Sequence, residues 1–250
     1  MSIETFYDQD YWTEGKHGGQ EISPAVFQRV MGPLIGRETV LDYGCGLGYN
    51  YQRSLVRAVG RYVGADASSM AVENARRKGL EAVQVDATNG TVPLPESTFD
   101  GAVCIEVFEH LFDPLSAARE LNRLLKPGGV LVTTVPNFGY HTWRLMALLR
   151  AQVPLEPDDP KENRFKGVHI RFFSKLMLKR LLRQAGFVNI KIGSFDDASV
   201  WDVFTAAGHF AAISNFARAH FPSFLHLRFL QDVWPNVFAK RLRAVASKPI

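Results

Sequence analysis

The chain has 250 residues, of which 46% are hydrophobic and 22% charged, with a formal net charge of +4 at pH 7. These proportions are typical of a soluble protein with an apolar core, and they exclude the collagen-like, disordered and disulfide-scaffold classes. No apolar run approaches the roughly 18–20 residues of a membrane span, and the first residues lack the pattern of a signal peptide, so we expect a cytoplasmic protein.

The N-terminal half shows alternating strand and helix patterns. Residues 1–37 hold a predicted helix near Ser23–Met31, and we interpret them as an N-terminal cover. A helix is predicted over residues 49–59, a second begins at Ser68 or Ser69 and ends at Gly79, and a third begins after Asp113 and ends at residues 127–129. Strands are predicted at residues 39–43, 61–66, 81–86, 101–105 and 130–135. This alternation predicts an α/β fold with a doubly wound parallel sheet, whose ligand crevice lies at the carboxyl ends of the strands.

The C-terminal half interrupts the alternation twice. Residues 136–173 are too long for a simple connection, and we interpret them as a lid insertion. Ser174 then caps a helix that Gly186 ends, and strands are predicted at residues 187–195 and 237–247. Between these strands lies an aromatic, helical insertion over residues 196–236. We therefore predict a single domain over residues 1–250, with a core at 38–135 and a C-terminal part at 174–250.

A glycine loop follows the first predicted strand in the sequence VLDYGCGLGYN (residues 40–50). Gly44, Gly46 and Gly48 allow a sharp turn and a close approach of the backbone to a ligand, while Asp42 lies two residues before the first glycine. A carboxylate at this position disfavours a pyrophosphate, which argues against a nicotinamide-dependent oxidoreductase, and favours a cationic or zwitterionic ligand.

Two more acids end the next two predicted strands. Asp66 is placed to accept both hydroxyls of a ribose, and Asp86 to receive an exocyclic amine such as that of adenine. Each aspartate alone could be a turn residue or a helix cap. Together with the glycines, the three acids predict a pocket for a positively charged nucleoside.

The chain resembles the class I S-adenosylmethionine-dependent methyltransferases over residues 38–195. The resemblance is carried by VLDYGCGLGYN, GADASSMAVENARRKG, VDA, FDGAVCIEVFEHLFDP and LNRLLKPGGVLVTTVPN, in that order. It implies the strand order 3-2-1-4-5-7-6 with an antiparallel seventh strand, and S-adenosylmethionine as the cofactor. The cofactor-binding residues that it implies are Asp42, Gly44, Cys45, Gly46, Gly48, Asp66, Ala67, Asp86, Ala87 and Glu106. Among them, Asp42 would lie near the amino group of the methionine part, and Cys45 departs from the small or polar residue of many members. We interpret Cys45 and Cys104, the two cysteines of the chain, as reduced core thiols.

The segment EVFEH (residues 106–110) follows the fourth predicted strand and carries the candidate catalytic residues Glu109 and His110. His110 has an ordinary pKa of about 6.5, which suits a general base for a hydroxyl or a phenol. Alternatively, Glu106, Glu109 and His110 could hold a divalent metal. The spacing resembles that of the ubiquinone-biosynthesis O-methyltransferases, whose members can use such a metal. A third interpretation, that Glu109 and His110 only orient the loop, stays open at this point.

Further candidates lie in the C-terminal half. In VHIRFFS (residues 168–174), His169 and Arg171 are candidate substrate-binding residues, although this motif could equally be structural. Residues 203–250 contain six basic residues and one acidic residue, and aromatic side chains are interleaved with them from residue 201 to 234. This segment is either a packed helical cap or a surface that contacts a membrane or a lipid-like acceptor.

The sequence predicts a methyltransferase that uses S-adenosylmethionine, acting on a hydroxyl of a small-molecule acceptor such as a phenol, quinol, sugar or lipid-linked compound. The alternatives are N- or C-methylation of a small molecule or a protein, and a non-catalytic protein that binds the cofactor and a partner. A nucleic-acid substrate is not expected, because the chain has no appended binding module and no target-base motif after the fourth strand.

Overall fold

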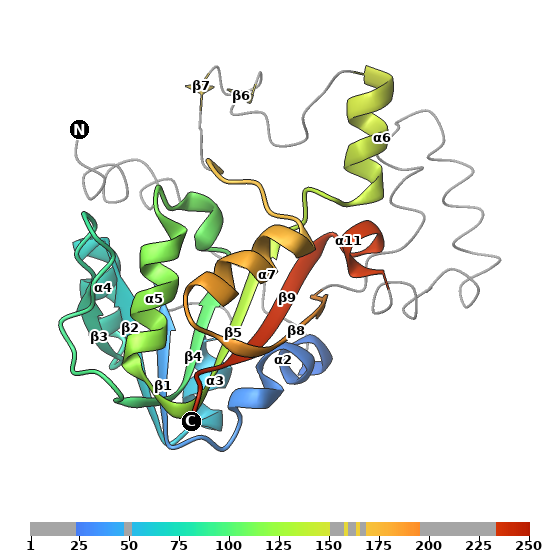
Figure 1. Cartoon of the computed structure of the whole chain (residues 1–250). Coiled ribbons are helices and arrows are strands. Elements are labelled where there is room, and N and C mark those ends of the chain that lie inside the picture. The colour runs from blue at the N-terminus through green and yellow to red at the C-terminus, as the bar shows by residue number, and fades with distance from the viewer. Residues whose placement is uncertain (1–23, 48–51, 151–157, 160–163, 166–168, 196–233) are drawn as a thin grey trace.

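Seven strands form one sheet in the order β3-β2-β1-β4-β5-β9-β8 (Figure 1). The computed structural model describes residues 24–47, 52–150, 158–159, 164–165, 169–195 and 234–250. The strands are β1 (Thr39–Tyr43), β2 (Arg61–Asp66), β3 (Glu81–Gln84), β4 (Phe99–Ile105), β5 (Leu125–Pro136), β8 (Val188–Ser194) and β9 (Arg241–Ser247). Strands β1 to β5 pair in parallel, whereas β9 runs antiparallel to β5 and β8. The predicted order, with its antiparallel seventh strand, is confirmed.

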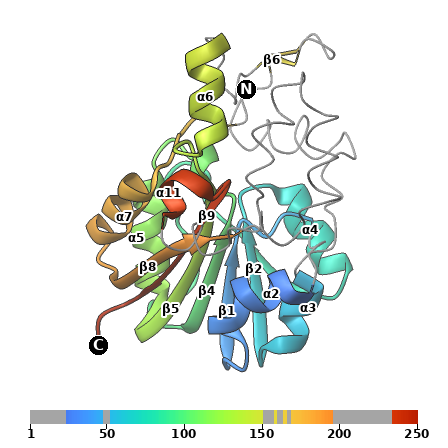
Figure 2. The same cartoon turned by 90° about the vertical axis from the view of Figure 1, so that its right-hand side faces the viewer.

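Helices cover both faces of this sheet (Figures 1 and 2). On one face, α5 (Pro114–Leu124) and α7 (Lys175–Gln184) bury leucines such as Leu121 and Leu182 in the largest apolar cluster. On the other face, α2 (Pro24–Met31), the short 3-10 helix η2 (Gly32–Leu34) and α3 (Gln52–Ala58) form a second cluster around Val40 and Val103. Helix α4 (Ser69–Arg77) packs beside β2 and β3. The amphipathic patterns of the sequence are thus used to build a three-layer α/β fold.

Side-chain caps begin the helices where the sequence predicts them. The Ser68 hydroxyl accepts the Ala71 N–H at 3.1 Å, the Ser174 hydroxyl accepts the Met177 N–H at 3.4 Å, and the Asp113 carboxylate accepts the Leu115 and Ser116 N–H groups. Each cap satisfies backbone donors that the first helical turn leaves without a partner.

Several predicted boundaries differ from the structure. Strand β3 ends at Gln84 instead of residue 86, and α5 ends at Leu124 because Leu125 is already extended, with φ −72° and ψ 143°. Strand β5 therefore begins five residues earlier than predicted, and its pairing with β4 contains an irregularity between Phe99 and Gly101. The last strand begins at Arg241, because Pro235 starts a short helix, α11 (Pro235–Phe238), instead.

The predicted lid insertion leaves the sheet at its carboxyl edge, by which we mean the carboxyl ends of β1, β2, β4 and β5. It contains α6 (His141–Arg150), which projects away from the sheet in both views, and the two-residue strands β6 (Asp158–Asp159) and β7 (Arg164–Phe165) (Figures 1 and 2). Most of the predicted aromatic insertion, residues 196–233, lies outside the described residues, as do residues 1–23 of the predicted N-terminal cover. Within the described ranges, no helix combines the length and apolarity needed to cross a membrane.

Asn137, which directly follows β5, joins three segments that are distant in the sequence. Its buried side-chain amide donates to the carbonyls of Pro235 at 3.0 Å and Ala239 at 2.7 Å, and its Oδ1 accepts the Gly139 N–H at 2.9 Å. It also forms an isolated parallel bridge with Phe173. The side chain of Asn137 therefore fixes where the lid insertion begins and where the segment before β9 passes the end of β5, while its backbone bridge places the segment before α7.

Candidate active site

The glycine loop after β1 adopts a conformation that requires glycine. Gly44 has φ +81° and Gly46 has φ +53°, and a Cβ atom at Gly44 would lie 2.3 Å from Cγ2 of Val107. The N–H groups of Gly44 and Cys45 donate to the carbonyl of Ala65 on β2 at 2.7 and 3.1 Å. The loop is thus held across the ends of β1, β2 and β4, as expected for a ligand-cradling turn. Gly48, the third predicted glycine, lies outside the described residues.

Asp42 lies beneath this loop. Its carboxylate is fully buried and accepts hydrogen bonds from the Tyr62 hydroxyl at 2.7 Å and the Gln52 amide at 3.3 Å. Gln52 also donates to the carbonyl of Cys45 at 3.1 Å. Asp42 therefore joins β1, β2 and α3 under the loop. The pattern around residues 40–50 gave no indication of the roles of Gln52 and Tyr62. The contact between Asp42 and a cofactor amino group stays a prediction.

Asp66 supports the same loop from the end of β2. One carboxylate oxygen accepts the Gly46 N–H at 2.8 Å and the other accepts the Ser68 N–H at 3.0 Å. Asp66 thus lies beside the glycine loop at the end of β2, and the predicted contact with the ribose hydroxyls stays a prediction.

The remaining predicted cofactor residues on this side of the sheet lie just beyond the carboxyl ends of β2 and β3. Asp86 is exposed, two residues beyond β3, and its carboxylate accepts the Thr88 N–H at 2.8 Å. Ala67 packs against the main apolar cluster, and Ala87 is half-buried. Cys45 and Cys104 are free and buried, as predicted, and burial raises the pKa of both thiols.

Glu106 lies at the end of β4 in the left-handed region, with φ +54°. Its N–H donates to the Thr134 carbonyl at 3.1 Å, and its carboxylate accepts the Thr134 hydroxyl at 2.8 Å. These contacts turn Glu106 toward β5. Among the described residues, the group with ligand atoms close enough for one metal ion is Glu109, His110 and His169, and it does not include Glu106, which still acts on Glu109 through its charge.

The structure instead groups Glu109 and His110 with His169. Glu109 and His110 belong to the 3-10 helix η3 (Phe108–His110), and His169 comes from the far end of the lid insertion. The His110 and His169 rings lie 4.8 Å apart, and one ligand atom from each of the three residues lies within 4.8 Å of the others. We call these three residues the acid–histidine cluster. This pairing is a long-range contact, and the sequence pattern gave no sign of it.

Within this cluster, Glu109 has an unusual environment. Its side chain is 1% exposed, and within the described structure neither carboxylate oxygen has a hydrogen-bond partner. Burial raises the pKa of Glu109 well above its usual range, and the charge of Glu106 raises it further. His110 Nε2 lies 3.9 Å from Glu109 Oε1, beyond hydrogen-bonding distance, and burial lowers the pKa of His169. Perturbed acid and base groups at the edge of a ligand crevice are typical of a catalytic site.

Arg171, the other candidate substrate-binding residue, lies on the surface beside the cluster. Its guanidinium donates to the carbonyls of Leu111, at 3.4 Å, and Phe112. No described contact directs it into the crevice, and its role toward a substrate stays a prediction.

Comparisons with known proteins agree with this geometry. A family model described as a methyltransferase domain matches residues 16–192, well over half of the chain. A probable S-adenosylmethionine-dependent methyltransferase of Mycolicibacterium smegmatis is 31% identical over 204 residues, which cover 80% of this chain and 68% of that protein. A ubiquinone biosynthesis O-methyltransferase of Alkalilimnicola ehrlichii is 35% identical over 132 residues, about half of each chain.

A solved structure shares the fold. Phosphoethanolamine N-methyltransferase 2 of Haemonchus contortus, in complex with S-adenosyl-L-methionine, aligns with a TM-score of 0.59 at 17% identity, covering 100% of this chain and 60% of that one. The sheet order, the glycine loop with its acids and the family match lead to one conclusion. The chain belongs to the class I S-adenosylmethionine-dependent methyltransferases.

Proposed function

We propose that this methyltransferase transfers the methyl group to a hydroxyl of a small molecule, with His110 as the general base. The observation that carries the proposal is the acid–histidine cluster, in which the imidazole of His110 lies beside a buried carboxyl group at the carboxyl edge. A hydroxyl must lose a proton during methyl transfer, and an imidazole is a side chain suited to accept that proton.

The cluster supplies proton transfer and orientation. When bound, S-adenosylmethionine supplies a methyl group activated by its positively charged sulfur, which keeps the electron pair of the broken carbon–sulfur bond. His110 takes the hydroxyl proton as the acceptor oxygen bonds to the methyl carbon. Glu109, 3.9 Å away, borders the imidazole without a hydrogen bond, and its burial, which raises its pKa, favours the uncharged carboxyl group. Loss of a general base typically costs a factor of roughly 10² to 10⁴ in rate.

A divalent metal is the second way in which this cluster could activate a hydroxyl. Glu109, His110 and His169 would hold it, because a buried carboxylate lacking a partner in the described structure and two imidazoles form a donor set that first-row transition metals accept. The bound ion would lower the pKa of the acceptor hydroxyl.

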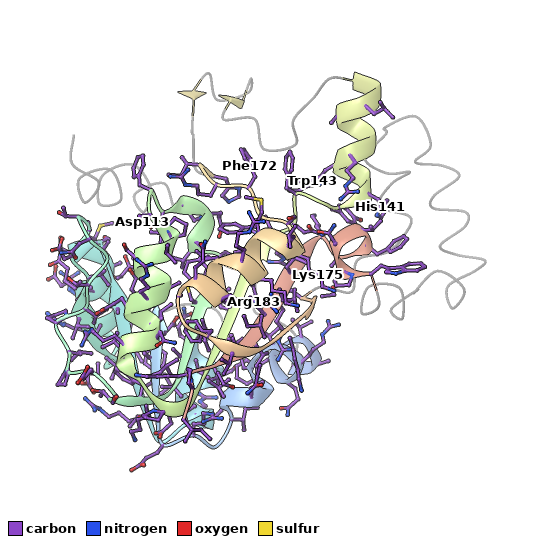
Figure 3. All side chains as sticks on the ribbon, viewed as in Figure 1. Asp113, His141, Trp143, Phe172, Lys175 and Arg183 are labelled. Carbon is purple, nitrogen blue, oxygen red and sulfur yellow. The ribbon has the colours of Figure 1, made fainter. Side chains whose placement is uncertain are left out.

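The surface of the carboxyl edge supports an apolar or lipid-like acceptor. Phe112 is 67% exposed, and the rings of Phe138 and Phe172 lie 5.0 Å apart with more than a third of each side chain exposed. Figure 3 shows Phe172 at this edge, between Asp113 and the helix that carries His141 and Trp143. Exposed aromatic side chains around a crevice mouth are suited to an apolar ligand.

The experiment measures transfer of a tritiated methyl group to phenols, quinols and sugars, each assayed beside an amine of similar size. We expect turnover of a hydroxyl acceptor, and we expect His110→Ala to lower kcat at least about 100-fold while the Kd for S-adenosylmethionine changes less than about twofold. His141→Ala is the matched control, since His141 lies on α6 and its ring contacts the Val237 carbonyl.

Other outcomes would contradict parts of this proposal. Turnover of amines without hydroxyls would identify an N-methyltransferase, a chemistry that the name of the Haemonchus contortus protein also describes. Activity that is lost with a chelator and restored by zinc or manganese would favour the metal over His110 as base.

A further inference from the structure

The segment before α7 crosses the carboxyl edge and is fixed at two places. The N–H groups of Ile170 and Arg171 both donate to the carbonyl of Glu109 at 3.0 Å. Further along, the carbonyl of Phe173 accepts the Phe138 N–H at 2.8 Å. We call residues 169–173 the crossing segment. Its main chain therefore connects η3 with the end of β5.

The side chain of Arg171 adds a second connection to the same region. Its Nε donates to the carbonyl of Leu111 at 3.4 Å, and its Nη2 donates to the carbonyl of Phe112. Among the described side chains, no carboxylate lies within ion-pair distance of Arg171. A planar guanidinium presents several donors in a fixed fork, so it can bridge two successive carbonyls in a way that the ammonium group of lysine cannot.

These contacts set the position of His169. His169 lies two residues before Arg171, whereas His110 immediately follows Glu109, whose carbonyl receives the backbone bonds. The two rings lie 4.8 Å apart although the residues are distant in the sequence. The crossing segment thus brings one imidazole of the acid–histidine cluster to the other, and Arg171 holds that segment from the outside.

We propose that Arg171 is a positioning residue, which clamps the crossing segment to residues 109–112 and so sets His169 against His110. The proposal rests on the proposed catalytic role of the cluster. It assigns Arg171 a function that differs from direct contact with the acceptor. It also explains the HIRFF sequence physically, because the backbone of this segment connects η3 with the end of β5 and its arginine bonds to the residues that follow η3.

The first experiment compares amide hydrogen exchange in the wild-type protein, Arg171→Ala and Arg171→Lys. We expect faster exchange in peptides that cover residues 108–113 and 169–173 in both variants, with unchanged exchange in β1 and β2. Arg180→Ala is the matched control, since Arg180 is an exposed arginine on α7. Faster exchange throughout the sheet would mean general destabilisation and would overturn the proposal, as would unchanged exchange in the two peptides.

The second experiment measures kinetics with the hydroxyl acceptor that turns over fastest in the panel described above. We expect Arg171→Ala to lower kcat about 10- to 100-fold with little change in acceptor KM, since small misplacements of catalytic groups have effects of this size. Millimolar guanidinium should restore part of the lost rate. A raised KM with an unchanged kcat would instead indicate direct acceptor binding and overturn the proposal.

A double-mutant cycle tests whether Arg171 acts through His169. If it does, Arg171→Ala should have little further effect on kcat once His169 has been replaced by alanine, whereas independent effects would multiply. Multiplying effects would contradict the proposal. If no acceptor turns over at all, the proposed hydroxyl methylation fails, while hydrogen exchange still decides whether Arg171 clamps the crossing segment.

Discussion

Glu109 and Glu120 are both buried glutamates, and their surroundings predict that ionisation of the two carboxyl groups has opposite effects on the stability of the folded state. Glu120 is 6% exposed; burial raises its pKa, but hydrogen bonds from Arg123 and the Val92 N–H outweigh this effect and lower the pKa overall. Glu109 is 1% exposed, and both burial and the charge of Glu106 raise its pKa. A carboxyl group whose pKa is lowered by folding stabilises the folded state above its unfolded pKa, and this stabilisation is lost as pH falls. A carboxyl group whose pKa is raised by folding destabilises the folded state as pH rises above its unfolded pKa.

We therefore expect Glu109→Gln to raise Tm at pH 7 to 8, with a gain that disappears near pH 4. A gain of about 1 kcal/mol would correspond to roughly 2–4 °C in a chain of this size. Glu120→Gln is the control and should lower Tm at neutral pH, because it weakens the pairing with Arg123. Thermal unfolding followed by circular dichroism across this pH range checks both variants. A lower Tm of Glu109→Gln at pH 8 would show that a cation or hydrogen-bond donor accompanies the ionised carboxylate.

Replacement of Asp66 tests the cofactor site. Asp66→Ala removes the predicted ribose acceptor and the bond that holds Gly46, and each charge-assisted hydrogen bond contributes about 1.5–3 kcal/mol. We expect at least about a tenfold weaker Kd for S-adenosylmethionine, measured by calorimetric titration. Glu73→Ala, on the exposed face of α4, should bind as the wild type does. Equal affinity of Asp66→Ala and wild type would place the cofactor elsewhere.

At the scale of elements, local chemistry predicted the capped helix starts and misplaced the end of α5. Ser68, Asp113 and Ser174 cap helices as expected, because a cap is determined by a few adjacent residues. The end of α5 was misplaced by the assumption that Pro127 stops the helix, whereas Leu125 is already buried and extended beside β4. Tertiary packing therefore decided a boundary that propensity alone could not.

In the candidate site too, features set by adjacent residues were predicted and features set by long-range contacts were not. The glycine loop, Asp66 and the η3 segment were predicted, because each lies in a contiguous motif at a strand end. The meeting of His169 with His110 and the hydrogen bond between Glu106 and Thr134 were not predictable. The first depends on how a long insertion returns to the sheet, and the second depends on the register of the neighbouring strand β5.

At the scale of the whole molecule, Asn137 connects the sheet to both insertions, so its loss should destabilise more than one segment. Asn137→Ala would leave the carbonyls of Pro235 and Ala239 and the Gly139 N–H without this partner. The Pro235 carbonyl still accepts the Ala239 N–H at 3.1 Å, so two groups become unsatisfied. Each costs about 1–3 kcal/mol, so we expect a loss near 3 kcal/mol, or roughly 6–12 °C in Tm.

Differential scanning calorimetry checks this expectation, with Asn122→Ala as the comparison, because the Asn122 amide nitrogen is buried and has no hydrogen-bond partner in the described structure. Asn137→Asp provides a second test, since it keeps the acceptor for Gly139 but loses both donors. Equal Tm values for Asn137→Ala and the wild type would show that the hydrogen bonds of the Asn137 side chain do not stabilise the fold.

The position of β9 has a consequence for synthesis of the chain. β9 is the last strand in sequence order, yet it lies between β5 and β8. Until residue 247 has left the ribosome, β5 has an open edge and β8 has no neighbour in the sheet, although strands β1 to β5 can already pair with one another. Open strand edges attract other chains. The nascent protein therefore passes through a stage in which the free edge of β5 can pair with another chain.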